Sequence, residues 1–431
     1  MHVYENTKFD AIVVGSGPGG AATAKELSQK GKRVLILEKG TNQPIIGSIL
    51  QTIEMAMVPG KSLLFTEQLL ALVRGITAGG SSIFYYATAI DPPFEMLESY
   101  GVNIRNEVAE VKRELPIAVL KDSLIGPAAV KIMESAKSLG YQWEKLPKMV
   151  FQDNCRKECD KCTMGCPYHA KWTAREFIDL ACSENATLVL KADVKKVLVE
   201  KNNAVGVLFS INGKEYQSFS DVTVLSAGGI GTPVILRSSG IKDAGQGYFF
   251  DPLIIANGFI EDTASGREFP MATGINLHED GIMMTDLMWP SWVYWLFTLE
   301  VFRFDCLFPY KRRLSIMIKI RDQLGGRITV KGGVRKQLRA IDKKKLMNGY
   351  DRARKILGNA GATNIFKTWY TATHPGGTAK LGDIVDSNLQ TKINHLYVCD
   401  CSVIPEPWGL PPTLTLLSLG KRLATHIAER W

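Results

Sequence analysis

The sequence predicts an α/β fold that begins with a strand, a tight turn, a helix and a second strand. Three observations carry this prediction: residues 9–15 are an apolar, strand-like run, GSGPGG follows as the turn, and an amphipathic helix leads to KRVLILE, which ends at Glu38. A helix that returns the chain to a parallel strand makes a βαβ unit. With 431 residues, 45% of them hydrophobic, the chain can bury a large core, and we expect one two-lobed unit or two domains.

The turn before the first helix has the spacing of a dinucleotide-binding site. Gly15, Gly17 and Gly20 make the GxGxxG pattern, in which missing side chains let the backbone approach a pyrophosphate at the helix N-terminus. Glu38, at the end of the next strand, is placed to accept hydrogen bonds from an adenosine ribose. The pattern predicts a Rossmann-type site and suits FAD and NAD alike.

The later elements follow in order along the chain. Residues 45–74 are apolar and helix-like up to the glycine-rich AGGSS, and residues 95–150 are mainly helical. Residues 187–229 read as strands, with NN and NG dipeptides that predict hairpin turns. Residues 256–370 form a separate region, and residues 413–431 close the chain as an amphipathic helix.

Four separated segments carry a family likeness. They are residues 10–40, RGITAGGSS at 74–82, VLSAGGIGTPVILRSSGI at 224–241, and HPGGTAKLG at 374–382 followed by the closing stretch 396–424. Together they cover about half of the chain, and it resembles the glucose-methanol-choline (GMC) oxidoreductases, most closely their cholesterol-oxidase-like, cysteine-containing branch. The order of the segments matches that family, so the resemblance decides for FAD over NAD.

The resemblance implies a Rossmann-type FAD-binding domain and a discontinuous α+β substrate domain. We expect the FAD-binding domain to comprise residues 1–95, 150–255 and 371–431, with a cysteine-rich loop at 154–172, and the substrate domain to comprise residues 96–149 and 256–370. The FAD is expected to be bound without a covalent link, because no attachment motif of the family is present.

The same resemblance implies further contacts to the cofactor. Gly79, Gly80 and Ser81 are expected to wrap the flavin side of FAD, and Val194 to meet the adenine through its backbone. Two more cofactor-binding positions come from the end of the chain. Asp400 is expected near the pyrophosphate or ribityl chain, and Thr413 opens the last helix.

By resemblance, His374 is the catalytic base, with Gly377 and Thr378 completing its HxxGT motif. An imidazole suits this task because its ordinary pKa lies near 6.5, so it accepts a proton at neutral pH. The family's second histidine or asparagine is replaced by Pro411, which offers no side-chain donor or acceptor. Tyr370, Glu406 and Trp408 are the residues considered as its replacement.

Four cysteines are clustered within twelve positions, and this spacing favours metal ligation over disulfides. Cys155, Cys159, Cys162 and Cys166 are separated by three, two and three residues, and a proline follows, close to the bacterial ferredoxin pattern. We therefore expect a [4Fe-4S] cluster, with zinc as the alternative and unliganded or disulfide-bonded thiols as the third possibility. No export leader opens the sequence, so we expect a cytoplasmic enzyme, with peripheral membrane contact as a further possibility.

Charge and aromatic residues mark two further segments. Residues 311–355 hold sixteen Lys or Arg against three Asp, which predicts an acidic electron-transfer protein, a partner subunit or an anionic membrane as partner. No nucleic-acid-binding motif accompanies these charges, so nucleic acid is not expected. Residues 286–308 are rich in aromatics and are read as substrate-lobe core, or alternatively as an apolar substrate tunnel or a membrane-facing patch.

Three functions remain open on the sequence. The first is a dehydrogenase that oxidises a CH–OH group of an apolar or bulky molecule and passes electrons through the cluster to a protein acceptor. The second is a flavin-dependent reductase of a ketone or activated alkene, which runs in the opposite direction. The third is an electron-transfer flavoprotein subunit with no small substrate of its own; His374 opposes it, and the loss of the second catalytic residue at Pro411 favours it.

Overall fold

The predicted N-terminal unit is present as β1 (Lys8–Val14), α1 (Pro18–Gln29) and β2 (Val34–Leu37). It belongs to a computed structural model that describes residues 4–308 and 311–431. β1 and β2 run parallel, with Ala11 opposite Val34 and Val14 opposite Leu37. Residues of these strands are buried on both faces, which explains their unbroken apolar sequence.

A seven-stranded sheet grows from this unit in the order β8, β2, β1, β11, β10, β9, with β21 paired to β11. β21 runs parallel to the end of β11, and β10 runs antiparallel to its beginning. Strands from the start, middle and end of the chain therefore form one sheet. The added strands are β8 (Thr187–Val189), β9 (Asp193–Glu200), β10 (Asn203–Ile211), β11 (Lys214–Leu225) and β21 (Leu396–Val398).

Both predicted hairpin turns are confirmed. The NN dipeptide joins β9 to β10, and the NG dipeptide joins β10 to β11. Asn212 and Gly213 have φ angles of 51° and 84°, the left-handed conformations that a two-residue hairpin turn requires.

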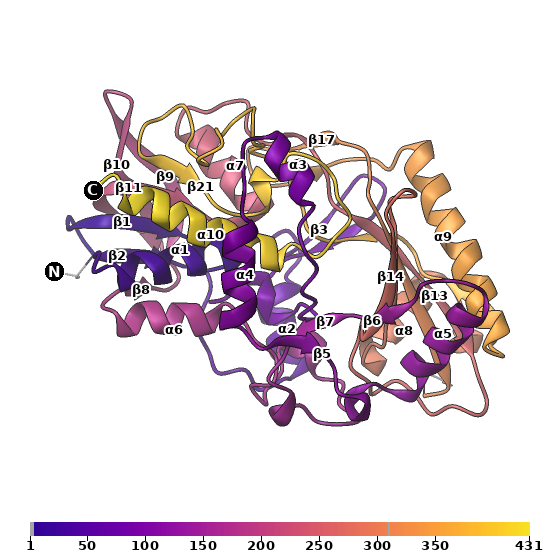
Figure 1. Ribbon diagram of the computed structural model, residues 1–431. Coiled ribbons are helices and arrows are strands. Elements are labelled where there is room, and N and C mark those ends of the chain that lie inside the picture. The colour runs from indigo at the N-terminus through magenta and orange to yellow at the C-terminus, as the bar shows by residue number, and fades with distance from the viewer. Residues whose placement is uncertain (1–3, 309–310) are drawn as a thin grey trace.

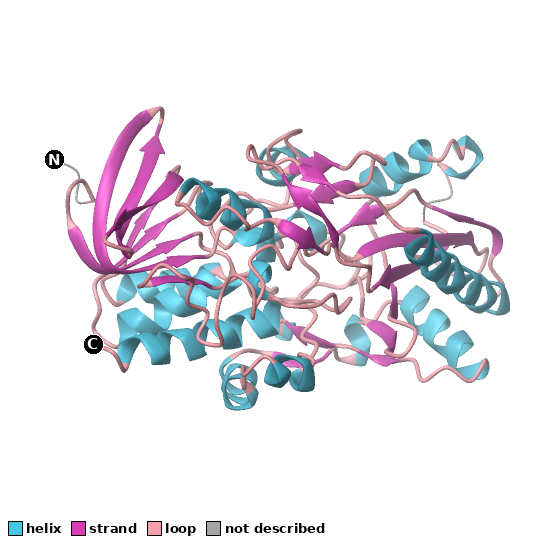
Figure 2. Ribbon diagram, turned by 90° about the horizontal axis from the view of Figure 1, so that it is seen from above, coloured by secondary structure: helices cyan, strands magenta, loops and turns pink. Residues whose placement is uncertain are grey.

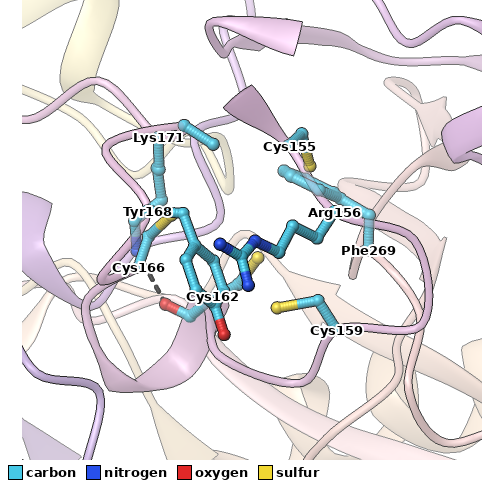
Figure 3. A pocket seen from close by; sticks show the side chains of 9 residues that line it. Cys155, Arg156, Cys159, Cys162, Cys166, Tyr168, Lys171 and Phe269 are labelled. Atoms are coloured by element: carbon cyan, nitrogen blue, oxygen red, sulfur yellow. Dashed lines mark hydrogen bonds between the residues drawn. The ribbon is translucent and has the colours of Figure 1, made fainter. Parts of the chain in front are cut away.

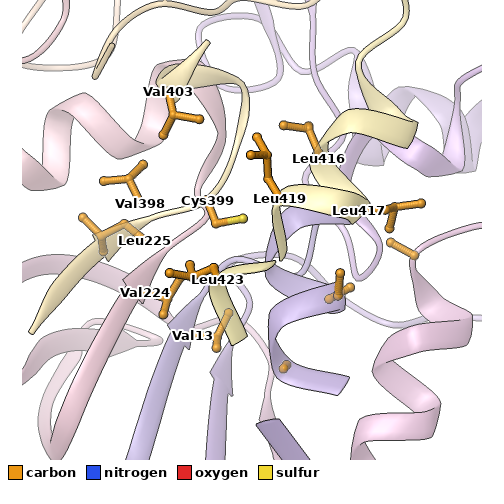
Figure 4. Packing of buried hydrophobic residues seen from close by; sticks show 14 of the residues in the cluster. Val13, Val224, Leu225, Val398, Cys399, Val403, Leu416, Leu417, Leu419 and Leu423 are labelled. Atoms are coloured by element: carbon orange, nitrogen blue, oxygen red, sulfur yellow. The ribbon is translucent and has the colours of Figure 1, made fainter. Parts of the chain in front are cut away.

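The C-terminal helix α10 (Thr413–Ala428) packs beside α1, so the last helix of the chain lies in the same lobe as the first (Figure 1). Its leucines surround Cys399 together with residues of β1, β11 and β21 (Figure 4). A Cβ on Gly420 would lie 2.7 Å from the carbonyl oxygen of Gly19. The two helices therefore approach closely at a point where each has a glycine. The predicted closing helix is confirmed, and it completes the core of the nucleotide lobe.

A nine-stranded sheet forms the other lobe, in the order β3, β4, β20, β13, β16, β15, β14, β6, with β19 paired to β13 (Figure 2). Helices α5 (Pro127–Ser138) and α9 (Ala340–Asn359) pack on one of its faces. The strands are β3 (Leu63–Phe65), β4 (Ala71–Val73), β6 (Glu144–Lys145), β13 (Pro252–Phe259), β14 (Thr273–Leu277), β15 (Ile282–Asp286), β16 (Arg313–Ile320), β19 (Thr363–Lys367) and β20 (Thr371–Ala372).

Smaller elements connect the two lobes. β12 (Gln246–Tyr248), β17 (Gly325–Ile328) and β18 (Val334–Arg335) make a three-stranded sheet, and β5 (Ile117–Val119) pairs with β7 (Pro147–Met149). The remaining helices are α2 (Ile49–Ala56), α3 (Phe94–Ser99), α4 (Arg105–Glu114), α6 (Arg175–Ser183), α7 (Gly228–Ser238) and α8 (Ser291–Glu300).

Two expectations about local structure are corrected. Residues 45–74 contain only the short helix α2, followed by the hairpin of β3 and β4, because Pro59 and Gly60 interrupt the apolar run. Residues 286–308 are not simply core: Trp295, Leu296 and Phe302 are 42%, 50% and 77% exposed, although Tyr294 is buried. Within the described ranges, no helix is long and apolar enough to cross a membrane.

Candidate active site

The glycine turn between β1 and α1 leaves open space where a pyrophosphate is expected. Gly15 has φ +99°, and a Cβ on it would lie 2.3 Å from the carbonyl oxygen of Ser226, so only glycine fits. A Cβ on Gly17 would meet no atom within 4 Å. Gly17 caps the N-terminus of α1, whose backbone N–H groups favour an anion. The turn therefore fits the phosphates of a dinucleotide.

Glu38 lies beside this turn and is linked to the second glycine loop through Ser16. Its carboxylate accepts hydrogen bonds from Ser16 N (3.1 Å), Ser16 Oγ (2.6 Å) and Gly40 N (2.7 Å). The backbone N–H of Gly79 donates to the same Ser16 Oγ over 3.1 Å. Burial raises the pKa of Glu38, and the hydrogen bonds from Ser16 oppose that shift. One hydroxyl thus joins two motifs that are 63 residues apart in sequence.

The other residues that are predicted to contact the adenosine and flavin parts of FAD lie near the same two glycine-rich turns. A Cβ on Gly80 would lie 3.1 Å from Gly17 Cα, so these two loops face each other directly. Ser81 Oγ accepts a hydrogen bond from Gly75 N at 3.0 Å, which shapes the second loop. Val194 is the second residue of β9 and follows Asp193, whose carboxylate pairs with Lys39 at 2.9 Å. Val194 therefore lies near the Glu38 end of the nucleotide site.

Asp400 holds the end of β21 against the N-terminus of α7. One carboxylate oxygen accepts from Gly228 N (2.8 Å) and Thr232 Oγ1 (2.5 Å), and the other accepts from Ser402 N (2.8 Å) and Ser402 Oγ (2.5 Å). Asp400 is thus a structural anchor of this corner, and its expected contact with the cofactor stays a prediction. Thr413 is 7% exposed at the first position of α10, directly after two prolines.

The loop that carries His374 packs against the same corner. A Cβ on Gly229 would lie 1.9 Å from Pro375 O, and Thr378 Oγ1 donates to Gly229 O over 2.8 Å. The HPGGT loop also pairs with the segment after Asp400, through Gly377 N and Cys401 O at 3.2 Å. The segments that resemble the family, although far apart in sequence, therefore converge on one site.

His374 is paired with a buried carboxylate that the sequence did not single out. Its Nδ1 lies 3.1 Å from Oδ2 of Asp251, so Nε2 is left for a reactant. Burial lowers the pKa of His374 well below its ordinary value, and the nearby Lys319 ammonium adds to that shift. Burial also raises the pKa of Asp251, to about 7, against the opposing pull of Lys319. The arrangement suits a neutral imidazole that accepts a proton.

The three residues considered as replacements at Pro411 lie in different surroundings. Glu406 accepts a hydrogen bond from Tyr100 at 3.1 Å in an exposed position, and Tyr370 packs edge-on against Trp369 at 5.1 Å between ring centroids. The indole N–H of Trp408 is buried and has no hydrogen-bond partner among the described residues. Of the three, only Trp408 keeps a buried donor available for another molecule.

The four clustered cysteines line one small pocket, together with Arg156, Tyr168, Ala170, Lys171 and Phe269 (Figure 3). All four are free thiols. Arg156 reaches across the pocket, with its guanidinium 3.8 Å from the ring centroid of Tyr168. In the part of the chain that the structure describes, no three His, Cys, Asp or Glu side chains are close enough to hold a metal ion. The expected metal site therefore stays a prediction.

The cysteine pocket adjoins the flavin-side loop through a buried lysine. The Lys171 ammonium donates to the carbonyl oxygens of Ile83 (2.8 Å), Tyr85 (2.8 Å) and Cys162 (2.7 Å). Ile83 ends the 3-10 helix Gly80–Ile83, which contains two of the predicted flavin-binding residues. Burial raises the pKa of the Cys162 thiol, and the Lys171 charge opposes this shift. The expected metal site and the expected flavin site thus share one buried cation.

Sequence reasoning missed three residues of this site: Ser16, Asp251 and Lys319. Ser16 stands inside the glycine motif, so a polar residue between Gly15 and Gly17 was a usable signal. Asp251 and Lys319 are charged residues beside or within apolar strand runs, FFDPLII and LSIMIKI. A lone charge in such a run is unexpected in a buried strand, and this signal could have marked both.

Comparison with known proteins agrees with this geometry. Two family models match the chain: the N-terminal GMC oxidoreductase model covers residues 9–279, and the C-terminal GMC oxidoreductase model covers residues 327–420. The uncharacterised protein MJ1450 of Methanocaldococcus jannaschii is 26% identical over 97% of this chain and 100% of its own length. The long-chain-alcohol oxidase FAO4A of Arabidopsis thaliana is 22% identical over 97% of this chain and 68% of its own length.

Solved structures show the same fold. The crystal structure of pyridoxine 4-oxidase from Mesorbium loti superposes with a TM-score of 0.74 at 17% identity, over 97% of this chain and 99% of that one. The nucleotide turn, the converging segments and the two family matches lead to one conclusion. The chain belongs to the GMC oxidoreductase family and is an FAD-dependent oxidoreductase that acts on CH–OH donors.

Proposed function

We propose that the protein is a dehydrogenase that oxidises a CH–OH group of an apolar or bulky substrate and passes the electrons through a [4Fe-4S] cluster to a protein acceptor. The observation that carries this proposal is the Lys171 ammonium, which joins the carbonyl of Cys162 to that of Ile83 in the flavin-side loop. A cluster held at the four cysteines would lie next to the flavin site. FAD, when bound, accepts two electrons as a hydride, whereas a [4Fe-4S] cluster carries one electron at a time.

Each part of the proposed reaction is assigned to particular residues of the chain. His374 Nε2 accepts the hydroxyl proton as the carbon gives up its hydride, so that a carbonyl product forms. Asp251 orients the imidazole through Nδ1. Gly17, where an added Cβ would meet no atom within 4 Å, and the facing loop at Gly80 would hold the cofactor. Cys155, Cys159, Cys162 and Cys166 supply the thiolates for the iron.

The face of the nine-stranded sheet opposite α9 supports an apolar substrate. An apolar cluster on this face includes Leu253 and Ile255 of β13, Met317 of β16, and Met283 of β15. Leu410, next to Pro411, packs against the same cluster. Methionine and aliphatic side chains adapt to apolar molecules of irregular shape. The substrate is therefore expected to lie between this cluster and the His374 loop.

Changing Cys162 to serine is expected to remove iron and keep FAD. Serine binds iron poorly, while the glycine turn that holds FAD is untouched. Anaerobically purified Cys162→Ser protein should contain FAD, be reduced by substrate, and fail to reduce an external one-electron acceptor. Iron and sulfide analysis, flavin absorbance and EPR measure these properties.

Cys182→Ser is the matched control, since Cys182 is a free thiol of α6 outside the cluster loop. This variant should keep iron, FAD and acceptor reduction at wild-type levels. Stoichiometric zinc without iron in anaerobically prepared wild-type protein would overturn the cluster and the dehydrogenase mechanism. An oxidase with a structural metal would then be the better function.

We further propose that the basic segment 311–355 receives an acidic electron-transfer protein. Three of its cations, Arg313, Lys319 and Lys336, are buried and cannot contribute to a surface. Exposed lysines and arginines remain on one helix, α9, among them Lys343, Lys344, Arg354 and Lys355. A helix with this many exposed cations attracts an acidic partner during diffusional encounter.

The exposed end of α8 supports peripheral membrane contact as the other candidate. Trp295, Leu296 and Leu299 of the helix are exposed, and Phe302 and Phe308 beyond it are 77% and 91% exposed. Two exposed cations, Lys311 and Arg312, follow this aromatic group. Aromatic side chains flanked by Lys and Arg are typical of helices that lie in a membrane interface.

The double variant Lys343→Glu/Lys344→Glu is expected to slow reduction of the protein acceptor about tenfold at low salt, with little difference at high salt. Stopped-flow reduction of the acceptor across a salt series measures this. Lys30→Glu/Lys196→Glu carries the same charge change on exposed positions of the nucleotide lobe and should behave as wild type. If acceptor reduction is independent of salt but anionic vesicles bind the wild type, the membrane proposal replaces the acidic acceptor.

A further inference from the structure

Lys319 occupies an unusual place in the second sheet. It lies in β16 opposite Leu253 of β13 and Met283 of β15, so it shares a face with the apolar cluster of Leu253, Met283 and Met317. Its side chain is only 1% exposed. A lysine in this position puts an ammonium group within the apolar wall that faces the His374 loop.

This ammonium makes no hydrogen bond and no ion pair in the described part of the protein, and the Asp251 carboxylate acts on it without direct contact. Other buried lysines are fully engaged. Lys336 pairs with Asp322 at 2.6 Å and donates to two carbonyl oxygens, and Lys148 donates to three oxygens. A buried charge that makes no hydrogen bond or ion pair lowers the stability of a fold. Stabilisation of the fold therefore does not account for a lysine at position 319.

Two polar atoms of segments that adjoin β16 are unsatisfied. Asp251 Oδ1 and Trp408 Nε1 are buried and have no hydrogen-bond partner among the described residues. Asp251 precedes β13 and binds His374, while Lys319 acts electrostatically on both. Burial lowers the pKa of Lys319 to about 8, and the Asp251 carboxylate opposes that shift. Lys319 and these unsatisfied atoms therefore belong to segments that adjoin the His374 loop and the end of β16.

The segment with Pro411 reaches the same strand. A Cβ on Gly409 would lie 3.1 Å from Arg321 N and 3.4 Å from Ile320 C, so this segment packs on the end of β16 directly after Lys319. Pro411 itself offers no donor. At this position a donor must therefore come from another residue, and β16 supplies one in Lys319, in addition to the Trp408 indole of the Pro411 segment itself.

We propose that Lys319 binds the oxygen of the substrate's hydroxyl group, the role for which Pro411 itself has no donor. This inference rests on the proposed oxidation of a CH–OH group. The Nζ group donates a hydrogen bond to the hydroxyl oxygen and His374 Nε2 takes the hydroxyl proton, while FAD, when bound, would accept the hydride from the carbon. One C–H and one O–H bond break, a carbonyl forms, and the ammonium stabilises the negative charge that develops on the oxygen.

The substrate class follows from this assignment. The apolar remainder of the molecule lies along the cluster of Leu253, Met283 and Met317, and only the hydroxyl end meets a cation. The site is thus expected to accept apolar alcohols and also small anions that imitate the charged oxygen. Acetate is a suitable probe, because its binding depends on the ammonium and requires no turnover.

Lys319→Met tests the proposal, because methionine matches the apolar stem of lysine and suits its methionine-rich surroundings. We expect full FAD content, anaerobic flavin reduction by octanol slower by about a hundredfold, and acetate binding weakened at least tenfold. Acetate binding is followed by the flavin absorbance spectrum. The thermal midpoint should stay the same or rise, because an unpaired buried charge is removed.

Lys25→Met is the matched control, since Lys25 is also buried but pairs with Glu26 at 3.2 Å and also with Glu114, away from the site. This variant should lose thermal stability and keep acetate binding. If Lys319→Met instead loses stability while flavin reduction and acetate binding stay at wild-type levels, Lys319 is structural and the proposal fails. If the wild type binds acetate through Lys319 but oxidises no alcohol, the proposed function fails and the anion site stands.

Discussion

Replacing His374 with alanine is expected to leave FAD bound and to slow flavin reduction by about a hundredfold or more, the scale for removing a general base. Nε2 of His374 is the free end of an imidazole held by Asp251 at 3.1 Å, and its lowered pKa keeps it neutral at pH 7. Alanine removes the acceptor for the hydroxyl proton and leaves the nucleotide turn unchanged. Anaerobic stopped-flow absorbance with octanol measures the rate, and FAD content is measured on the same sample.

His278→Ala is the control for this experiment, because His278 is exposed in the turn between β14 and β15. It should reduce its flavin at the wild-type rate. An unchanged single-turnover rate in His374→Ala would show that the proton goes to another group. Asp251, which contacts His374 Nδ1, would then be the next candidate, ahead of Glu406, which accepts a hydrogen bond from Tyr100 in an exposed position.

Replacing Gly17 with valine is expected to abolish FAD retention while the protein stays folded. A Cβ on Gly17 would meet no protein atom within 4 Å, and its φ of −67° and ψ of 178° are accessible to valine. The fold therefore tolerates the side chain, and the pyrophosphate does not, because both occupy the same space at the N-terminus of α1. Flavin absorbance after purification, and titration with added FAD, measure the loss.

Gly358→Val provides the comparison, since Gly358 of α9 also has no atom within 4 Å of its added Cβ and is far from the nucleotide turn. That variant should keep FAD. A Gly17→Val protein that binds FAD with wild-type affinity would place the pyrophosphate elsewhere. Far-UV circular dichroism on both variants separates loss of cofactor from loss of fold.

Much of the nucleotide lobe could be predicted from the sequence because its signals are local. The strand, glycine turn and helix of residues 8–29 occupy consecutive positions, and each follows from periodicity or from glycine geometry. The hairpins at Asn202 and Asn212 follow from their dipeptides in the same way. The second sheet was harder to predict, since β3 and β4 are short strands and β4 joins the sheet by pairing with β20, about three hundred residues later.

Exposure was the least predictable property. The aromatic residues 286–308 suggested a core, but α8 buries Tyr294 and turns Trp295 and Leu296 outward. In the same way, the basic segment 311–355 contains buried and exposed cations in one sequence run. The sequence gives the number of aromatic and basic residues in these two segments. Which of them are exposed to water depends on the residues that pack against them, and those come from other parts of the chain.

The sequence by itself determined the cofactor turn, which depends on residue types at short spacings, and the family, which depends on four motif segments and their order. The candidate base His374 followed from that resemblance. Only the tertiary structure brought His374 to Asp251, 123 positions away, and placed Lys319 on the apolar face beside them. The reason is physical: the effect of a charge on a neighbour depends on distance and burial, and both are set by how two separate sheets pack around the site.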